Sequence, residues 1–159
     1  MRFILAAVGR LKDAEAQLYE RYERRFDSSG RALGLGPLKL SEIGEARAAG
    51  ADQRKADEAA RLMKAAEAAD AKIVLDEHGK TLSSEELARF IAEWRDDGCK
   101  AMAFLIGGPD GHGPEALEAA ALKLSLGRLT LPHGIARIVL AEQLYRATTI
   151  LSGHPYHRA

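Results

Sequence analysis

The last residues of the sequence, His154-Pro155-Tyr156-His157-Arg158, bring together side chains that can stack, form hydrogen bonds and move protons. Histidine accepts a proton near neutral pH, tyrosine stacks on nucleic-acid bases, and arginine binds phosphate. Chain ends are more commonly polar segments without a defined role, so the same residues are also compatible with a solvated tail. The residue types alone leave both interpretations open.

Glu142 and Arg146 lie shortly before this tail, in a stretch with a helical pattern. Their spacing of four residues, with the acid first, is the favourable order for an ion pair along a helix. Because they are close to the tail in sequence, they could also belong to the same site.

Three segments follow predicted strands: LDEHGK at 75–80, IGGPDG at 106–111 and LGRLTLPH at 126–133. The glycines of IGGPDG would let the backbone approach a ligand closely, although such a run is more often only a tight turn. The segment lacks the ending of a phosphate-binding loop and the spacing of a dinucleotide fingerprint. With leucines as apolar walls, the three segments suit a ligand that contains adenine but no phosphate. Leucines beside strands are, however, more often simply core.

Short apolar runs alternate with helical patterns along the chain, which predicts an α/β fold with a parallel sheet flanked by helices. No linker divides the chain, so residues 1–159 are expected to form a single domain. Asp52 is the predicted cap of one helix, and Ser83 with Glu86 has capping-box spacing at the start of another. Ligands of such sheets usually bind at the carboxyl ends of the strands, where the three segments lie. We expect strands at residues 2–9, 37–43, 72–75, 101–106 and 123–126, and helices at about 13–26, 52–69, 83–98, 114 onward and 134–150.

The composition is that of an ordinary globular protein, with 159 residues of which 47% are hydrophobic and 29% charged. This balance excludes a disordered chain, a collagen and a coiled-coil rod. No apolar run approaches the roughly 20 residues needed to cross a bilayer, and no signal peptide is recognisable, so a cytoplasmic location is expected. Cys99 is the only cysteine and excludes an internal disulfide framework. The histidines are too scattered in sequence to indicate a metal site, and no nucleophilic-serine elbow is present.

Charge is balanced overall but unevenly divided along the chain. Residues 1–40 contain 8 basic and 5 acidic side chains, residues 41–118 contain 10 and 17, and residues 119–159 contain 5 and 1. Both ends could therefore build a basic surface for RNA, although ordinary scatter explains the counts equally well. Arg21, Arg24 and Arg25 could contact phosphates or could simply form a solvated helix face.

Taken in order, LDEHGK, FLIGGPDG, LSLGRLTLPH, EQLYRA and the ending HPYHR resemble the ribosomal RNA large subunit methyltransferase H (RlmH) family, which belongs to the SPOUT methyltransferases. The resemblance covers nearly the whole chain. It implies a SPOUT-type parallel sheet in which the C-terminal segment threads through a loop as a trefoil knot, within roughly residues 72–159. Knots are otherwise essentially absent from proteins, and neither composition nor periodicity indicates this one.

The resemblance further implies a homodimer that uses S-adenosylmethionine to methylate N3 of a pseudouridine in 23S ribosomal RNA of the assembled ribosome. No metal is required for this reaction, because a sulfonium methyl group is already activated and the enzyme mainly aligns the attacking nitrogen and removes its proton. A histidine or a relayed carboxylate would take that proton. The implied cofactor positions are Leu75, Gly108, Gly127, Arg128, Leu129, Thr130, Leu131 and Pro132. The residues expected to hold the pseudouridine are Glu142, Arg146, His154, Tyr156, His157 and Arg158.

Two positions depart from the family pattern. Gly127 stands where a serine is expected, and His112 stands where an apolar residue is expected.

A non-catalytic ribosome-associated RNA-binding protein on the same fold would show a damaged cofactor loop or a lost tail, whereas here only Gly127 is unusual. A nucleotide-binding regulator would show phosphate-binding loops, which the sequence lacks.

Overall fold

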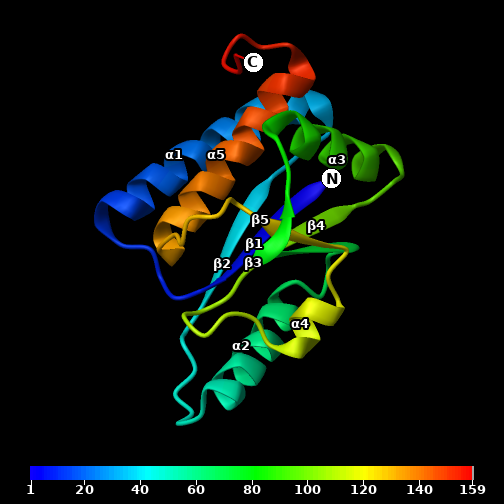
Figure 1. The fold of residues 1–159 in the computed structure, drawn as a ribbon. Helices are drawn as coiled ribbons and strands as arrows, with labels where there is room; N and C mark the ends of the chain where they lie inside the picture. The colour runs from blue at the N-terminus through cyan, green and yellow to red at the C-terminus, as the bar shows by residue number, and fades with distance from the viewer. Residues whose placement is uncertain (159) are drawn as a thin grey trace.

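The computed structural model describes residues 1–158 as a parallel five-stranded sheet between two layers of helices (Figure 1). Helices α1 (Asp13–Gly30), α3 (Ser84–Asp96) and α5 (His133–Ser152) cover one face, and α2 (Ala51–Ala65) and α4 (Pro114–Glu118) cover the other. The predicted α/β architecture is therefore confirmed. The strands are β1 (Arg2–Val8), β2 (Leu38–Ile43), β3 (Ala71–Thr81), β4 (Ala101–Ile106) and β5 (Leu122–Ser125), in the spatial order β2-β1-β4-β3-β5.

The centre of the sheet is apolar on both faces. Every residue of β4 is buried, as its unbroken run of apolar side chains predicts. Phe3 on β1 packs edge-on against Phe26 of α1, with ring centroids 4.9 Å apart, and lies 6.4 Å from Phe104 of β4. This packing joins α1 to the two central strands.

Strand β3 is longer than the predicted strand at 72–75. After Leu75 its pairing with β5 shifts, and Lys80 and Thr81 then pair with Leu124 and Ser125. Gly79 makes this possible, because a Cβ there would lie 2.6 Å from the carbonyl oxygen of Lys123. The irregular segment between the two paired parts is polar and projects at the carboxyl end of the sheet.

The helix boundaries test the capping predictions. Ser83 and Glu86 form the expected capping box, with the Glu86 backbone nitrogen 3.1 Å from Ser83 Oγ and the Ser83 nitrogen 2.7 Å from Glu86 Oε2. The prediction for Asp52 was wrong, because the cap is Gly50, two residues earlier, and no side chain caps the helix, which begins at Ala51. That helix also ends at Ala65 rather than at residue 69.

A buried arginine joins the start of α5 to the sheet. Arg137 is 2% exposed, and its guanidinium donates to the carbonyl oxygens of Val8 (2.6 Å) and Gly9 (3.1 Å) and to Glu42 Oε2 (2.9 Å). Burial lowers the pKa of Arg137, and the neighbouring Glu42 carboxylate opposes that effect. The contacts anchor the first turns of α5 against the carboxyl ends of β1 and β2.

Replacing this arginine is expected to destabilise the fold. In Arg137→Ala the two carbonyl oxygens and Glu42 lose a buried cationic partner, so the free energy of unfolding should fall by about 3–5 kcal/mol. Urea denaturation followed by circular dichroism measures the change, with exposed Arg21→Ala as the control. A loss below about 1 kcal/mol, the range of ordinary surface substitutions, would contradict this role.

Within residues 1–158, no helix is both long enough and apolar enough to cross a membrane.

Candidate functional site

A cavity of about 530 Å³ opens at the carboxyl ends of β3, β4 and β5. The segments that follow these three strands line it together, although they are far apart in sequence. Six of the eight positions predicted for the cofactor are part of its wall, and Arg128 and Pro132 are not. The six are Leu75, Gly108, Gly127, Leu129, Thr130 and Leu131.

The glycine-rich turn after β4 is held by His112. The backbone nitrogen of Gly107 donates to His112 Nε2 at 3.1 Å, and Gly108 pairs with Gly111, whose φ is +83°. Burial lowers the pKa of His112, so its ring is neutral at pH 7 and Nδ1 carries the proton. Within residues 1–158 this buried Nδ1 has no hydrogen-bond partner. The unusual histidine therefore closes the turn from inside the protein.

A salt bridge fixes the tip of the same turn. Arg54 of α2 donates to Asp110 Oδ2 at 2.7 Å and to Asp110 Oδ1 at 3.3 Å, and it also binds the carbonyl oxygens of Ala48 and Ala49. The hydrogen bonds from Arg54 lower the pKa of Asp110. Asp110 is therefore a charged structural partner rather than a free acid.

The charged groups of the cavity wall favour a ligand without phosphate. Lys55 is the one lysine or arginine among the lining residues, whereas Asp76 and Glu77 place two carboxyl groups there besides Asp110. Asp76 accepts a hydrogen bond from the backbone nitrogen of His78 at 2.8 Å. Phosphate sites use several cations or a helix N-terminus; the start of α5 does line this wall, but carboxylates outnumber the single lysine there and favour a cationic ligand. The wall fits a neutral heterocycle joined to a positively charged group.

The segment after β5 has a conformation that glycine allows. Gly127 has a φ of +125°, and a Cβ there would meet nothing within 4 Å. Ser125 Oγ donates to the Gly127 carbonyl at 3.0 Å and accepts from the Gly127 nitrogen at 3.2 Å. The local hydrogen bonds of this turn thus come from Ser125, without a hydroxyl at position 127.

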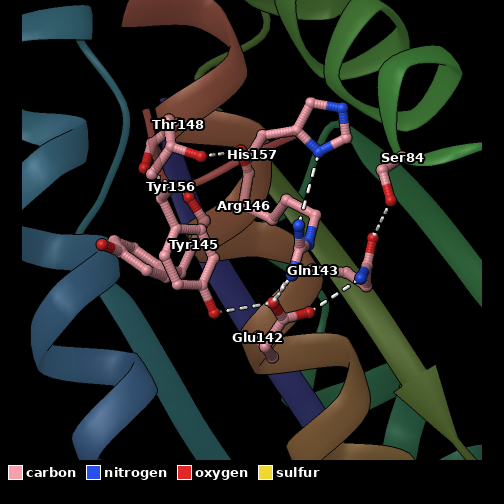
Figure 2. Close-up of polar contacts among 9 residues, drawn as sticks. Ser84, Glu142, Gln143, Tyr145, Arg146, Thr148, Tyr156 and His157 are labelled. Carbon is pink, nitrogen blue, oxygen red and sulfur yellow. Dashed lines mark hydrogen bonds and ion pairs between the residues drawn. The ribbon is translucent and has the colours of Figure 1, made fainter. Parts of the chain in front are cut away.

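The second group of predicted residues gathers at the far end of α5 (Figure 2). Glu142 Oε1 accepts from the Tyr156 hydroxyl at 3.0 Å and from Arg146 Nη2 at 2.7 Å. The Arg146 guanidinium lies 4.9 Å from the centre of the Tyr156 ring, which is 4.7 Å from the Tyr145 ring. Burial and the bond to Glu142 raise the pKa of Tyr156 to about 12, so its hydroxyl donates rather than ionises at neutral pH.

The histidines of the tail have different surroundings. His157 Nδ1 lies 3.4 Å from Arg146 Nη1, and its Nε2 lies 2.8 Å from Glu85 Oε1 on α3. His154 is exposed and its Nδ1 accepts from the Tyr156 backbone nitrogen at 3.1 Å. Arg158 is exposed. The folded tail therefore joins Tyr156 and His157 to Glu142 and Arg146.

In one chain the tail and the cavity lie at opposite ends of α5 (Figure 1). His133 and Ala136, at the start of the helix, line the cavity, whereas the tail follows Ser152 at its other end. A helix of 20 residues is about 30 Å long, so these two groups do not form one site within a single copy.

Sequence patterns did not indicate several residues of these two groups. Ser84, Glu85 and Gln143 contact the tail cluster, although only the flanking capping residues Ser83 and Glu86 have a recognisable spacing. Lys55 belongs to the cavity wall although α2 lies far from the three loops in sequence.

Among residues 1–158, no group of three or more histidine, cysteine, aspartate or glutamate side chains is placed to hold a metal ion.

Comparison with known proteins gives consistent matches. A family model described as "Predicted SPOUT methyltransferase" matches residues 1–157. The chain is 52% identical over 160 residues to the ribosomal RNA large subunit methyltransferase H of Brucella anthropi, covering 100% of both proteins. It is 50% identical over 160 residues to the protein of the same name from Xanthobacter autotrophicus, again covering 100% of both. Among solved structures, a probable methylase family protein from Haemophilus influenzae Rd KW20 has a similar fold, with a TM-score of 0.56 and 12% identity over 99% of this chain and 70% of that one.

Proposed function

This chain belongs to the SPOUT methyltransferase family, and from that membership we propose that it is a methyltransferase that acts on large-subunit ribosomal RNA. The proposed reaction is the methylation of N3 of a pseudouridine in 23S ribosomal RNA with S-adenosylmethionine as the methyl donor. The full-length relatives named ribosomal RNA large subunit methyltransferase H support the RNA class. The tail cluster and the cavity support the finer statement.

The observation that supports this proposal most strongly is the convergence of three loops on one cavity. Its volume of about 530 Å³ is within the range of small-molecule sites. The backbone of Gly108 and of the lining residues after β5, with the side chain of Leu75, would hold the adenosine part of the donor; those residues are Gly127, Leu129, Thr130 and Leu131. Asp76 and Glu77 would face its positive charges.

The binding preference of the cavity tests the proposal. Isothermal titration calorimetry should detect binding of S-adenosylmethionine at micromolar concentrations. ATP and NAD should bind at least about 100-fold more weakly, a difference of about 2.7 kcal/mol, because the cavity wall has few cations for phosphate. Equal affinity for ATP would favour a nucleotide-binding protein and contradict the proposal.

The tail cluster is proposed to hold the pseudouridine. S-adenosylmethionine, when bound, supplies an activated methyl group, so the protein has to align the attacking nitrogen and accept its proton. Tyr156 and Arg146 offer a stacking ring and hydrogen-bond donors, and Glu142 holds both in place. His154 and Arg158 are exposed beside them and are proposed to contact the RNA.

We propose a homodimer, and the separation of the two groups supports it. The tail of one chain lies a helix length from its own cavity, so we infer that it completes the cavity of a second copy. Leu129 and Ile135 support an interface near the cavity, because both are large apolar residues that are exposed, Leu129 to 82%. Apolar side chains exposed near a binding site are typical of protein interaction surfaces.

The proposal includes the fold details that the resemblance implies. Residues 1–159 would form one SPOUT domain with a trefoil knot within roughly residues 72–159. The protein would act on assembled ribosomes in the cytoplasm, without a metal.

The alternative function is a non-catalytic ribosome-associated RNA-binding protein with the same fold. It would require neither the cavity nor the ordered tail cluster. The convergence of the three loops on one cavity favours the enzyme over this alternative.

A further inference from the structure

We propose that Glu85 and His157 form a carboxylate–histidine pair in which Glu85 fixes the ring so that His157 Nδ1 accepts the N3 proton of the target pseudouridine. Glu85 would act as a positioning residue through His157. This inference rests on the proposed function, because it assigns a base to that reaction. It is built on a contact between α3 and the tail that joins residues 72 positions apart in sequence.

The two neighbours of the His157 ring define its tautomer. Arg146 Nη1 can only donate, so His157 Nδ1, 3.4 Å away, is the acceptor. The proton of the neutral ring then lies on Nε2, which donates to Glu85 Oε1 at 2.8 Å. The side chain of His157 is 17% exposed and that of Glu85 is 44% exposed, so the imidazole is largely shielded from solvent while the carboxylate keeps contact with it. A carboxylate on Nε2–H orients the imidazole and stabilises the imidazolium that forms when Nδ1 takes a proton.

Glu85 is well placed to remain ionised. It lies in the first turn of α3, where the helix dipole favours a negative charge. Its pKa is lowered by its own backbone N–H first, and then by hydrogen bonds from His157 and Ser83. The carboxylate is therefore charged at the pH at which the histidine has to act.

The adjacent residue Ser84 holds the other side of the same cluster. Ser84 Oγ donates to Gln143 Oε1 at 2.6 Å, and Gln143 Nε2 donates to Glu142 Oε2 at 2.7 Å (Figure 2). Glu142 in turn holds Arg146 and Tyr156. The start of α3 thus supports both the proposed base and the residues proposed to hold the pseudouridine.

Substrate binding would release the nitrogen that acts as base. At 3.4 Å the contact between Arg146 and His157 Nδ1 is long for a hydrogen bond, so little is lost when Arg146 turns to a carbonyl oxygen beside N3. N3 then forms a bond to the methyl carbon while the carbon–sulfur bond breaks and its electron pair stays on sulfur. The N3 proton passes to His157 Nδ1, and Glu85 balances the new charge.

The charged and titratable groups that face or adjoin His157 are Glu85 from α3, Arg146 and Glu142 from α5, and Tyr156 and Arg158 from the tail.

The pair can be tested with Glu85→Ala and Glu85→Gln, with the exposed Glu93→Ala on the same helix as the control. Single-turnover methyl transfer to ribosomes is measured as a function of pH, and the affinity for S-adenosylmethionine by calorimetry. A general base contributes about 10²- to 10⁴-fold, so loss of its orienting carboxylate should slow Glu85→Ala by about 10- to 100-fold and move the acidic limb of the pH profile to lower pH. Glu85→Gln should lose less, because its amide oxygen still accepts from Nε2–H. Binding of S-adenosylmethionine and the Glu93→Ala control should be unchanged.

A measurement without turnover separates this proposal from the proposed function. Nitrogen-15 NMR of the free protein should show His157 with Nε2 protonated and Nδ1 unprotonated, and Glu85→Ala should give a mixture of tautomers. The pair is refuted if wild-type His157 carries its proton on Nδ1, or if Glu85→Ala keeps the rate and pH profile of the wild type. Absence of any methyl transfer by the wild type would instead refute the proposed function, and the NMR spectrum would still decide whether Glu85 fixes the tautomer.

Discussion

A chain that ends at Gly153 is expected to lose at least about a thousandfold in methyl transfer to ribosomes while it still binds S-adenosylmethionine. The truncation removes Tyr156, His157 and Arg158 together, and with them the proposed base and the groups that orient the pseudouridine. General base catalysis alone contributes about 10²- to 10⁴-fold, and loss of orientation adds to this. Transfer of a radioactive methyl group to ribosomes under saturating donor gives the rate.

The truncation is compared with a chain that ends at Arg158, which keeps every side chain of the proposed site. The donor is proposed to bind the loops after β3, β4 and β5, which both chains retain, so the donor affinity should be the same in both. Normal turnover by the chain that ends at Gly153, with normal donor binding, would exclude the tail from the mechanism.

The second large effect is expected at the cavity. Gly127→Val places a branched side chain at a φ of +125°, where residues other than glycine are strained by about 1–3 kcal/mol. The new side chain also adds bulk to a wall of the cavity. Because of this strain and bulk, we expect the affinity for S-adenosylmethionine to fall by about 30- to 100-fold, where each factor of ten corresponds to about 1.4 kcal/mol. Calorimetry measures the change.

Gly44→Val is the matched control, because Gly44 is exposed, has no positive φ, and a Cβ there would meet nothing within 4 Å. Both variants should retain the helical circular dichroism of the wild type. If Gly127→Val binds the donor as tightly as Gly44→Val does, the segment after β5 is not part of the donor site.

Much of the fold could be predicted from local patterns. The unbroken apolar run at 101–106 predicts a central strand, and the spacing of Ser83 and Glu86 predicts the start of α3; the structure confirms both. Local patterns failed where distant backbone decides the outcome. The second half of β3 is polar and contains Gly79, so it does not resemble a strand, yet it pairs with β5.

The candidate site also has one part that the sequence predicts and one part that depends on distant contacts. The loops at the carboxyl ends of the strands could be predicted to meet, because parallel strands end at the same edge of a sheet. The side chains that support them could not be predicted, since Arg54 binds Asp110 across 56 positions and Arg137 binds the Val8 carbonyl across 129. The pairing of Glu85 with His157 likewise depends on how α3 packs against α5. Such contacts are consequences of the tertiary structure and have no local signature.

The most direct test of the central claim is mass-spectrometric mapping of 23S ribosomal RNA from cells that lack this protein, before and after incubation of their ribosomes with the purified protein and S-adenosylmethionine. We predict that one pseudouridine lacks its N3 methyl group in these cells and that incubation restores it, with a mass increase of one methyl group at that nucleotide alone. An unchanged methylation map in the deletion strain, or a pseudouridine that stays unmethylated after incubation, would contradict the account.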